Sequence, residues 1–212
     1  MELYFNPESP FTRWIIEREL LHEHFVVIDA GCQGGVHVQW DLLGAFGEVH
    51  AFDAIKEVVD DLTLRETRPG RYYHNIALGN EDGERTFFVK PNNPFASSFI
   101  AKDIRARFVD YGPDVIVDPD GPAARIIKVS RLDTLFAEGI LPKADVIKMD
   151  CEGFEPEILA GAKDYMRSSQ VLAVTTETNM LPSKTGGRTQ FDDLHASVLE
   201  QGLSVFDLVS ER

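Results

Sequence analysis

Short continuous apolar runs alternate along the chain with stretches in which apolar residues recur at helical spacing. The runs are about four to eight residues long, often end in an acid, and suit strands buried on both faces of a parallel sheet. Such strands are predicted at residues 25–31, 48–54, 71–78, 125–129, 144–150 and 171–178. Helices are predicted at residues 10–24, 35–46, 56–66, 130–139, 155–169 and 190–202. The alternation predicts an α/β domain with a mostly parallel central sheet and helices on both faces.

Three segments depart from this regular alternation. Residues 84–90 are predicted as a strand that follows the turn GNEDG, and residues 203–209 as a final strand. Residues 91–124 contain five prolines and no clean periodicity, which is typical of a lid or a binding loop. No internal repeat or linker interrupts the chain, so we predict one domain over residues 1–212.

The net charge of the chain limits the kinds of molecule that it is expected to bind. The chain has a formal net charge of -14, which argues against binding to the phosphate backbone of nucleic acids, whereas a cationic small molecule remains a suitable ligand. Cys32 and Cys151 lack the spacing of a disulfide framework or zinc site, so we expect a reducing, cytoplasmic location. The N-terminus lacks the features of a secretory signal, and no apolar run reaches the roughly 18 residues of a membrane helix, so no membrane partner is expected.

Chemistry is expected at the carboxyl ends of the strands, where open parallel sheets bind their ligands. The first turn, DAGCQGG over residues 29–35, has glycines that let a ligand approach closely, although a tight turn without a ligand has the same pattern. Its spacing differs from the G-x-G-x-x-G of dinucleotide binders, and Asp29 would favour a cationic amino-acid group. Asp53 ends the second strand, where a carboxylate either accepts hydrogen bonds from both ribose hydroxyls of an adenosine cofactor or caps the next helix.

Taken together, these features resemble the class I, Rossmann-like methyltransferases that use S-adenosylmethionine. VIKMDCEGFEPEILAGA, residues 146–162, is similar to the hallmark segment of FkbM-type methyltransferases, roughly I-K-[ILM]-D-x-E-G-x-E followed by an apolar pair and Gly-Ala. VVIDAGCQGG, HAFDA, NIALGNEDGERTFFV, SSF and VSRLDTL stand where that family has related segments. The resemblance spans about residues 26–180, and it departs from the usual Asn, Glu and Pro at Gln33, Asp53 and Ala54.

The resemblance implies S-adenosylmethionine as the cofactor, with its contacts at the strand ends. The cofactor-binding residues expected on this basis are Asp29, Gly31, Gln33, Gly35, Asp53, Ala54, Ile76 and Ala77. Class I methyltransferases end with an inserted antiparallel strand, but this chain stops at Arg212 after one predicted strand, so either the seventh strand is missing or the sequence is truncated. An exposed sheet edge would invite a second copy, so a homodimer is an open alternative.

Four carboxylates follow the predicted strand over residues 144–150. Asp150 and Glu152 are the candidates for catalysis. Asp150 is either a general base, or a Mg²⁺ ligand together with Glu177 and Asn179, or a cap of the next helix. The sequence leaves these three roles open.

The other charged residues of this segment are expected to be structural. Glu155 and Glu157 fall in the first turn of a helix, where the dipole favours carboxylates, and Glu157 is expected to face water. Lys148 lies inside the strand and is expected to pair with one of the acids.

These expectations combine into one function with two alternatives. The resemblance implies an O-methyltransferase that acts on a hydroxyl of a small polyhydroxylated molecule, a natural product or a saccharide. Ser97, Ser98 and Glu177 are the expected substrate contacts. The alternatives are an NAD(P)-dependent oxidoreductase with an unusual glycine turn, and a Rossmann-like binding module without turnover.

Overall fold

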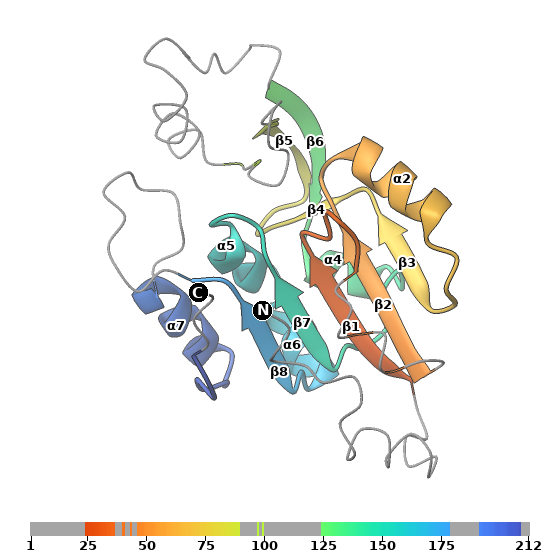
Figure 1. Ribbon diagram of the computed structural model, residues 1–212. Helices are drawn as coiled ribbons and strands as arrows, with labels where there is room; N and C mark the ends of the chain where they lie inside the picture. Colours follow the sequence, from red (N-terminus) through yellow and green to blue (C-terminus); the bar gives the residue numbers. More distant parts are fainter. Residues whose placement is uncertain are drawn as a thin grey trace.

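The computed structural model describes residues 24–36, 40, 43, 46–89, 97, 99, 124–178 and 191–208 (Figure 1). Three predictions fall mainly outside these residues. They are the helices at 10–24 and 35–46 and the irregular segment at 91–124.

Five parallel strands form the central sheet, in the order β3-β2-β1-β7-β8 (Figure 1). Their bounds are β1 Phe25–Ala30, β2 Gly47–Phe52, β3 Arg71–His74, β7 Val146–Met149 and β8 Ala173–Thr176. β1 lies at the centre and pairs with β2 on one side and with β7 on the other. The predicted parallel sheet is confirmed, and the carboxyl ends of its strands lie along one edge.

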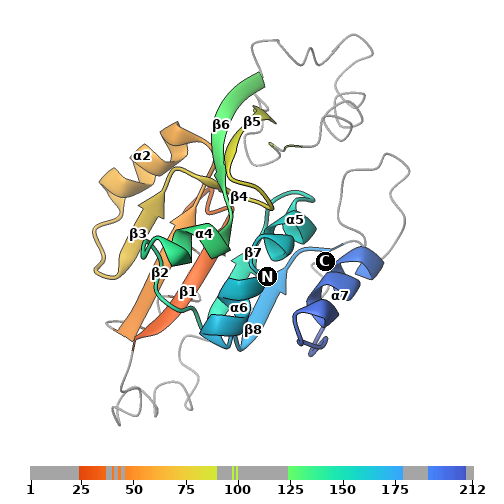
Figure 2. The same ribbon diagram turned by 180° about the vertical axis from the view of Figure 1, so that it is seen from behind.

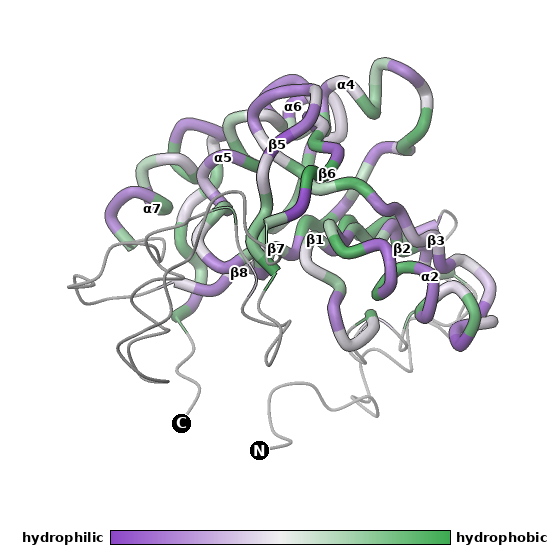
Figure 3. The backbone as a smooth tube through the Cα atoms, turned by 90° about the horizontal axis from the view of Figure 1, so that it is seen from above, coloured by the Kyte–Doolittle hydropathy of each residue, from purple (hydrophilic) through white to green (hydrophobic). Residues whose placement is uncertain are grey.

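Side chains alternate across β1 and divide the core into two layers. Val26 and Ile28 belong to a large apolar cluster on one face, and Val27 belongs to a smaller cluster on the other. Helix α2 (Lys56–Arg65) covers the smaller cluster through Leu62. The large cluster includes residues of α4 (Leu132–Ala137), α5 (Glu155–Ala160), α6 (Lys163–Ser169) and α7 (Phe191–Glu200). Helices therefore cover both faces, as predicted (Figure 1, Figure 2), and α2, α5 and α7 each contain both hydrophilic and hydrophobic residues (Figure 3).

A second sheet has three strands in the order β4-β6-β5. Its strands are β4 (Ala77–Leu78), β5 (Gly83–Phe88) and β6 (Ala124–Ser130), with β4 parallel and β5 antiparallel to β6. The single strand predicted at 71–78 is therefore wrong, because β3 and β4 belong to different sheets. Asn75 marks the break: its side-chain amide donates to the carbonyl oxygens of Asp53 (3.2 Å) and Ala54 (3.1 Å), which holds the chain against the turn after β2.

The helix predicted over 155–169 is interrupted between α5 and α6, at Gly161 and Ala162. A Cβ atom at Gly161 would lie 1.9 Å from the carbonyl oxygen of Gly79. The backbone after α5 thus contacts the backbone after β4, and only glycine permits this approach. The contact joins the small sheet to the helical layer.

The strand predicted over 203–209 is wrong for the part that the structure describes. Residues 203–208 form no strand: Leu203 contacts the large apolar cluster, whereas Phe206 is fully exposed. The strand pattern is present, but strand formation depends on a paired neighbour, and no described residue pairs with the outer edge of β8. Of the helices in the described ranges, none has the length and apolarity to cross a membrane.

Replacing Gly161 with alanine should reduce the free energy of unfolding by about 2–3 kcal/mol, because the new methyl group would force two backbones apart. Chemical denaturation measures the change. Ala160→Gly, at the exposed neighbouring position, is the control and should cost about 1 kcal/mol through helix propensity alone. Equal stability of the two variants would contradict the close contact with Gly79.

Candidate active site

A cavity of about 260 Å³ opens at the carboxyl ends of the central strands. This is the edge at which parallel α/β sheets bind ligands. Residues that follow each of the five central strands meet residues of the small sheet in its lining. The lining contains these predicted site residues: Gly31, Gln33, Asp53, Ala54, Ile76, Ala77, Ser97, Asp150, Glu152 and Glu177.

Of the other four predicted site residues, two do not line the cavity and two lie outside the described residues. Asp29 is completely buried within β1, and Gly35 lies outside the lining. Ser98 and Asn179 lie outside the described residues. Ligand contacts by these four residues remain predictions.

The cavity also has lining residues that the sequence did not predict. They are Ala30, Phe52, Ile55, Leu78, Phe87, Phe99, Cys151 and Phe154. Most directly precede or follow a predicted residue, so extending each strand-end segment would have found them. Phe87 carries no such signal, because it reaches the cavity through the pairing of β5 with β6.

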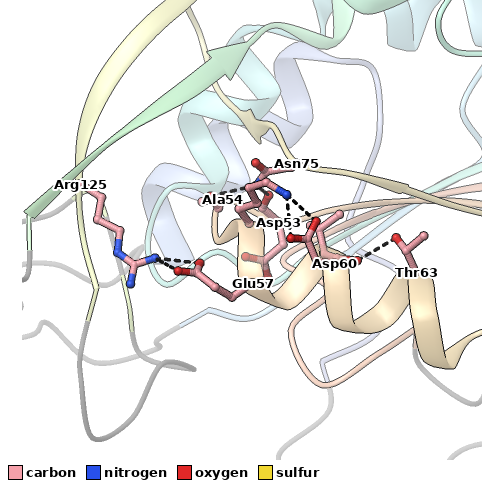
Figure 4. Close-up of polar contacts among 9 residues, drawn as sticks. Asp53, Ala54, Glu57, Asp60, Thr63, Asn75 and Arg125 are labelled. Atoms are coloured by element: carbon pink, nitrogen blue, oxygen red, sulfur yellow. Dashed lines mark hydrogen bonds and ion pairs between the residues drawn. The ribbon is translucent and has the colours of Figure 1, made fainter.

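The turn after β2 fixes Asp53 at the rim of the cavity (Figure 4). Asp53 Oδ1 accepts a hydrogen bond of 2.8 Å from the backbone N–H of Ile55, the N-cap of α2, and so closes the turn before the helix. No side chain caps α2 itself, so the helix-capping role left open by the sequence is wrong for Asp53. The two bonds from the Asn75 amide hold the backbone of the same turn. Beside it, the Arg125 guanidinium donates to both oxygens of Glu57 at 2.8 Å and ties β6 to α2.

Asp53 is an unusual acid because it is only 8% exposed. Burial raises the pKa of its carboxyl to about 6, although the backbone N–H of Ile55 and the Lys148 ammonium both lower it. No described residue donates to Asp53 Oδ2. A buried carboxylate with a raised pKa at a cavity is typical of a functional site.

Lys148 links the turns that follow β1 and β7. Asp29 and Lys148 are direct partners in the register of these strands, and Lys148 Nζ lies 3.1 Å from Asp29 Oδ1. The same ammonium donates to the Gly31 carbonyl oxygen at 3.3 Å and lies 3.9 Å from Asp150 Oδ2. Burial opposes the charge, but the two carboxylates raise the pKa of Lys148 above its usual value. The predicted pairing of Lys148 with an acid is confirmed.

Gly31 brings these two turns into contact. Its φ is +81°, and a Cβ atom there would lie 2.0 Å from the backbone oxygen of Asp150. Glycine is therefore required by the packing of one turn on the other, in addition to any approach of a ligand.

The acids in and after the turn that follows β7 differ in exposure and in backbone conformation. The Asp150 side chain is 51% exposed, and both Asp150 and Glu152 line the cavity. Glu152 has a φ of +54°, in the left-handed region that side chains rarely adopt. The prediction that Glu157 faces water is wrong, since it is half-buried and burial raises its pKa.

Glu155 falls in the first turn of α5, as predicted, but it does not face solvent. It is 1% exposed, and its Oε1 accepts hydrogen bonds from the backbone N–H groups of Cys151 (2.8 Å) and Gly153 (3.3 Å).

Three aromatic rings form another part of the lining. The ring centroids of Phe99 and Phe87 are 5.0 Å apart, and those of Phe99 and Phe154 are 4.4 Å apart. The Arg85 guanidinium lies 5.1 Å from the Phe154 ring and 5.5 Å from the Phe99 ring, a cation–π arrangement.

The described residues contain no preformed metal site and two free cysteines. Within the described ranges, no group of three or more His, Cys, Asp or Glu side chains could hold a metal ion, and Asn179 lies outside them. Cys32 and Cys151 are both free, and burial raises the pKa of both thiols. Protonated thiols are poor nucleophiles, so redox chemistry is disfavoured.

Comparison with known proteins identifies the family. The family model described as "Methyltransferase FkbM domain" matches residues 32–204. The chain belongs to the FkbM methyltransferase family. Membership confirms the resemblance of the hallmark segment and favours methyl transfer over the NAD(P)-dependent oxidoreductase.

One solved structure is also similar to this FkbM-family chain. It is a methyltransferase FkbM from Methylobacillus flagellatus KT, at 16% identity and a TM-score of 0.40, covering 78% of this chain and 38% of that one. The chain thus spans well under half the length of that protein. Comparison with curated protein sequences gave no match.

Replacing Lys148 with methionine should reduce the free energy of unfolding by about 3–5 kcal/mol, because the Asp29 carboxylate would lose the nearest compensating cation. The double variant Asp29→Asn/Lys148→Met should recover most of this loss. Denaturant titrations of these two variants and of Asp29→Asn give the coupling energy. Lys56→Met breaks an exposed pair with Asp60 and should cost under about 1 kcal/mol. Additive effects at Asp29 and Lys148 would contradict the coupling.

Proposed function

We propose that the chain catalyses S-adenosylmethionine-dependent O-methylation of a hydroxyl on a small polyhydroxylated molecule, a natural product or a saccharide. The observation that carries the proposal is the lining of the cavity, where the buried carboxylate of Asp53 lies with the acids Asp150 and Glu152. Family membership supports methyl transfer as the reaction class. The cofactor and the acceptor are those that the resemblance to the family implies, and the residue types of the cavity are compatible with both.

The residues of the cavity fit the proposed cofactor. Asp53 Oδ2 is suited to accept hydrogen bonds from ribose hydroxyls, because Oδ1 already accepts one from Ile55. Phe52, Ile55 and Ile76 offer apolar contacts to an adenine ring, and the turn with Gly31 and Gln33 would hold the amino-acid end. When bound, S-adenosylmethionine would supply a methyl carbon already activated by a sulfonium.

The protein must then position the acceptor and accept its proton. Asp150 is suited to act as the base, since its half-exposed carboxylate lines the cavity. Glu152, from the same turn, is the second candidate. Ser97 and Glu177 line the cavity and can hydrogen-bond to other hydroxyls of the acceptor. Asp150 and Glu177 could instead share a Mg²⁺ ion that lowers the pKa of the acceptor hydroxyl.

Binding of S-adenosylhomocysteine tests the cofactor assignment. Isothermal titration calorimetry should detect binding to the folded protein, and Asp53→Asn should weaken it by about tenfold or more, because an amide cannot replace both acceptor oxygens. Absence of binding at millimolar ligand would refute the cofactor. Binding without methyl transfer across a broad acceptor panel would instead support the binding module without turnover.

The raised pKa of Asp53 predicts the pH dependence of the same measurement. The carboxylate is the acceptor form, so affinity should be constant above pH 6 and fall as the pH drops below about 6, where Asp53 gains a proton. Asp53→Asn should abolish this fall. It should also stabilise the fold by up to about 3 kcal/mol above pH 6, because a buried charge is removed, with the gain disappearing toward pH 4. Unchanged pH dependence in the variant would exclude Asp53 from the cofactor site.

Asp150→Asn tests the base. Turnover should fall by about 10²–10⁴-fold, while the affinity for S-adenosylhomocysteine changes by less than about threefold, because only proton acceptance is lost. Methyl transfer to an acceptor panel, followed by mass spectrometry, measures the effect. Full turnover by Asp150→Asn would rule out Asp150, and activity that survives EDTA would rule out the Mg²⁺ role.

A further inference from the structure

The buried carboxylate of Glu155 has no role in the chemistry described above. Its Oε1 accepts hydrogen bonds from the N–H groups of Cys151 and Gly153, and the residue is 1% exposed. These two N–H groups precede and follow Glu152 along the chain. A buried carboxylate is costly unless it is hydrogen-bonded, so its position calls for an explanation beyond the helix dipole.

We propose that Glu155 is a positioning residue that closes the turn over 150–154 and thereby directs Asp150 and Glu152 into the cavity. The catalytic roles of the two acids rest on the proposed function. We call the two hydrogen bonds from Cys151 and Gly153 to Glu155 the clamp. Its effect on the shape of the turn does not depend on which reaction the protein catalyses.

The backbone of the turn carries the argument. Glu152 has a φ of +54° and Gly153 a φ of +99°, so two consecutive residues have positive φ. A left-handed glutamate is unfavourable in isolation and persists only when its surroundings impose it. Here the N–H groups on both sides of Glu152 converge on one oxygen, as backbone N–H groups do when they form a concave anion site. Here the side-chain oxygen of Glu155 takes the place that a bound anion would have in such a site.

Glu157 provides the matched comparison. It lies in the same first turn of α5 and is half-buried, but it makes no hydrogen bond to the turn that precedes the helix. If the dipole alone explained these acids, the two glutamates would be equivalent. Burial and the paired bonds distinguish Glu155.

Cys151 provides a reporter for the clamp. Burial, and then the Glu155 carboxylate, raise the pKa of the Cys151 thiol, so it is protonated and slow to react at neutral pH. Opening of the turn would expose this thiol. Cys32, the other cysteine of the chain, is buried in the smaller apolar cluster and serves as the internal control.

The test compares Glu155→Ala and Glu155→Gln with Glu157→Ala, in the full chain without ligand. Glu155→Ala should increase the amide hydrogen exchange of Cys151 and Gly153 by about 100-fold or more, and iodoacetamide labelling of Cys151 by about tenfold. Labelling of Cys32 should change by less than about twofold. Glu155→Gln keeps an acceptor oxygen and should restore the exchange rates of both amides to within about threefold of the wild type, whereas its labelling rate also reflects the lost charge beside the Cys151 thiol. Glu157→Ala should leave them unchanged.

Turnover separates positioning from stability. Where methyl transfer is detected, Glu155→Ala should lower kcat by about 30-fold or more with little change in the KM for S-adenosylmethionine, and Glu155→Gln should rescue kcat. Wild-type exchange at Cys151 and Gly153 in Glu155→Ala would overturn the clamp. If that variant does not fold, Glu155→Asp, one methylene shorter, should still raise the exchange about tenfold, and wild-type exchange there would equally overturn the clamp. Altered exchange without any methyl transfer would leave the clamp standing and refute the proposed function.

Discussion

A charged amine inside a parallel sheet is the constraint on which the site depends. Lys148 lies within β7, and its ammonium is compensated because the register places Asp29 of β1 directly beside it. The cost of desolvating a charge is high, so the two central strands cannot slip relative to each other without losing this compensation. The same ammonium reaches the Gly31 carbonyl and approaches Asp150. One cation thereby fixes the relative positions of the turns that carry the candidate cofactor and acceptor contacts.

Three buried acids near this edge of the sheet differ in what compensates their burial. Asp29 lies against the Lys148 ammonium, and Glu155 accepts backbone N–H groups. Asp53 has one backbone donor on one oxygen, and its pKa remains raised to about 6. The first two arrangements stabilise the fold. The third leaves electrostatic strain at the cavity, which a ligand with hydroxyl donors would relieve, and such strain is typical of sites that evolved for binding.

The parts of the fold that were predicted correctly are those specified by local pattern. The runs at 25–31 and 144–150 are apolar on both faces, and the topology of parallel sheets then places their ends together. The break of 71–78 depends on Asn75 bonding to a turn more than twenty residues away, and Phe87 reaches the cavity through the pairing of β5 with β6. Glu155 and Glu157 look alike in the sequence, because burial and hydrogen bonds alone distinguish them. The errors therefore arise where non-local contacts override local preference.

The strand order places the proposed cofactor contact and the proposed base on opposite sides of β1. Asp53 follows β2 and Asp150 follows β7, with β1 between them. Each carboxylate is held by its own turn: Asp53 through Asn75 and Ile55, and Asp150 through the turn that Glu155 closes. Lys148 is the shared element, since it lowers the pKa of Asp53 and lies 3.9 Å from Asp150 Oδ2. Local substitutions in either turn should therefore separate cofactor affinity from turnover, whereas a change at Lys148 should alter both.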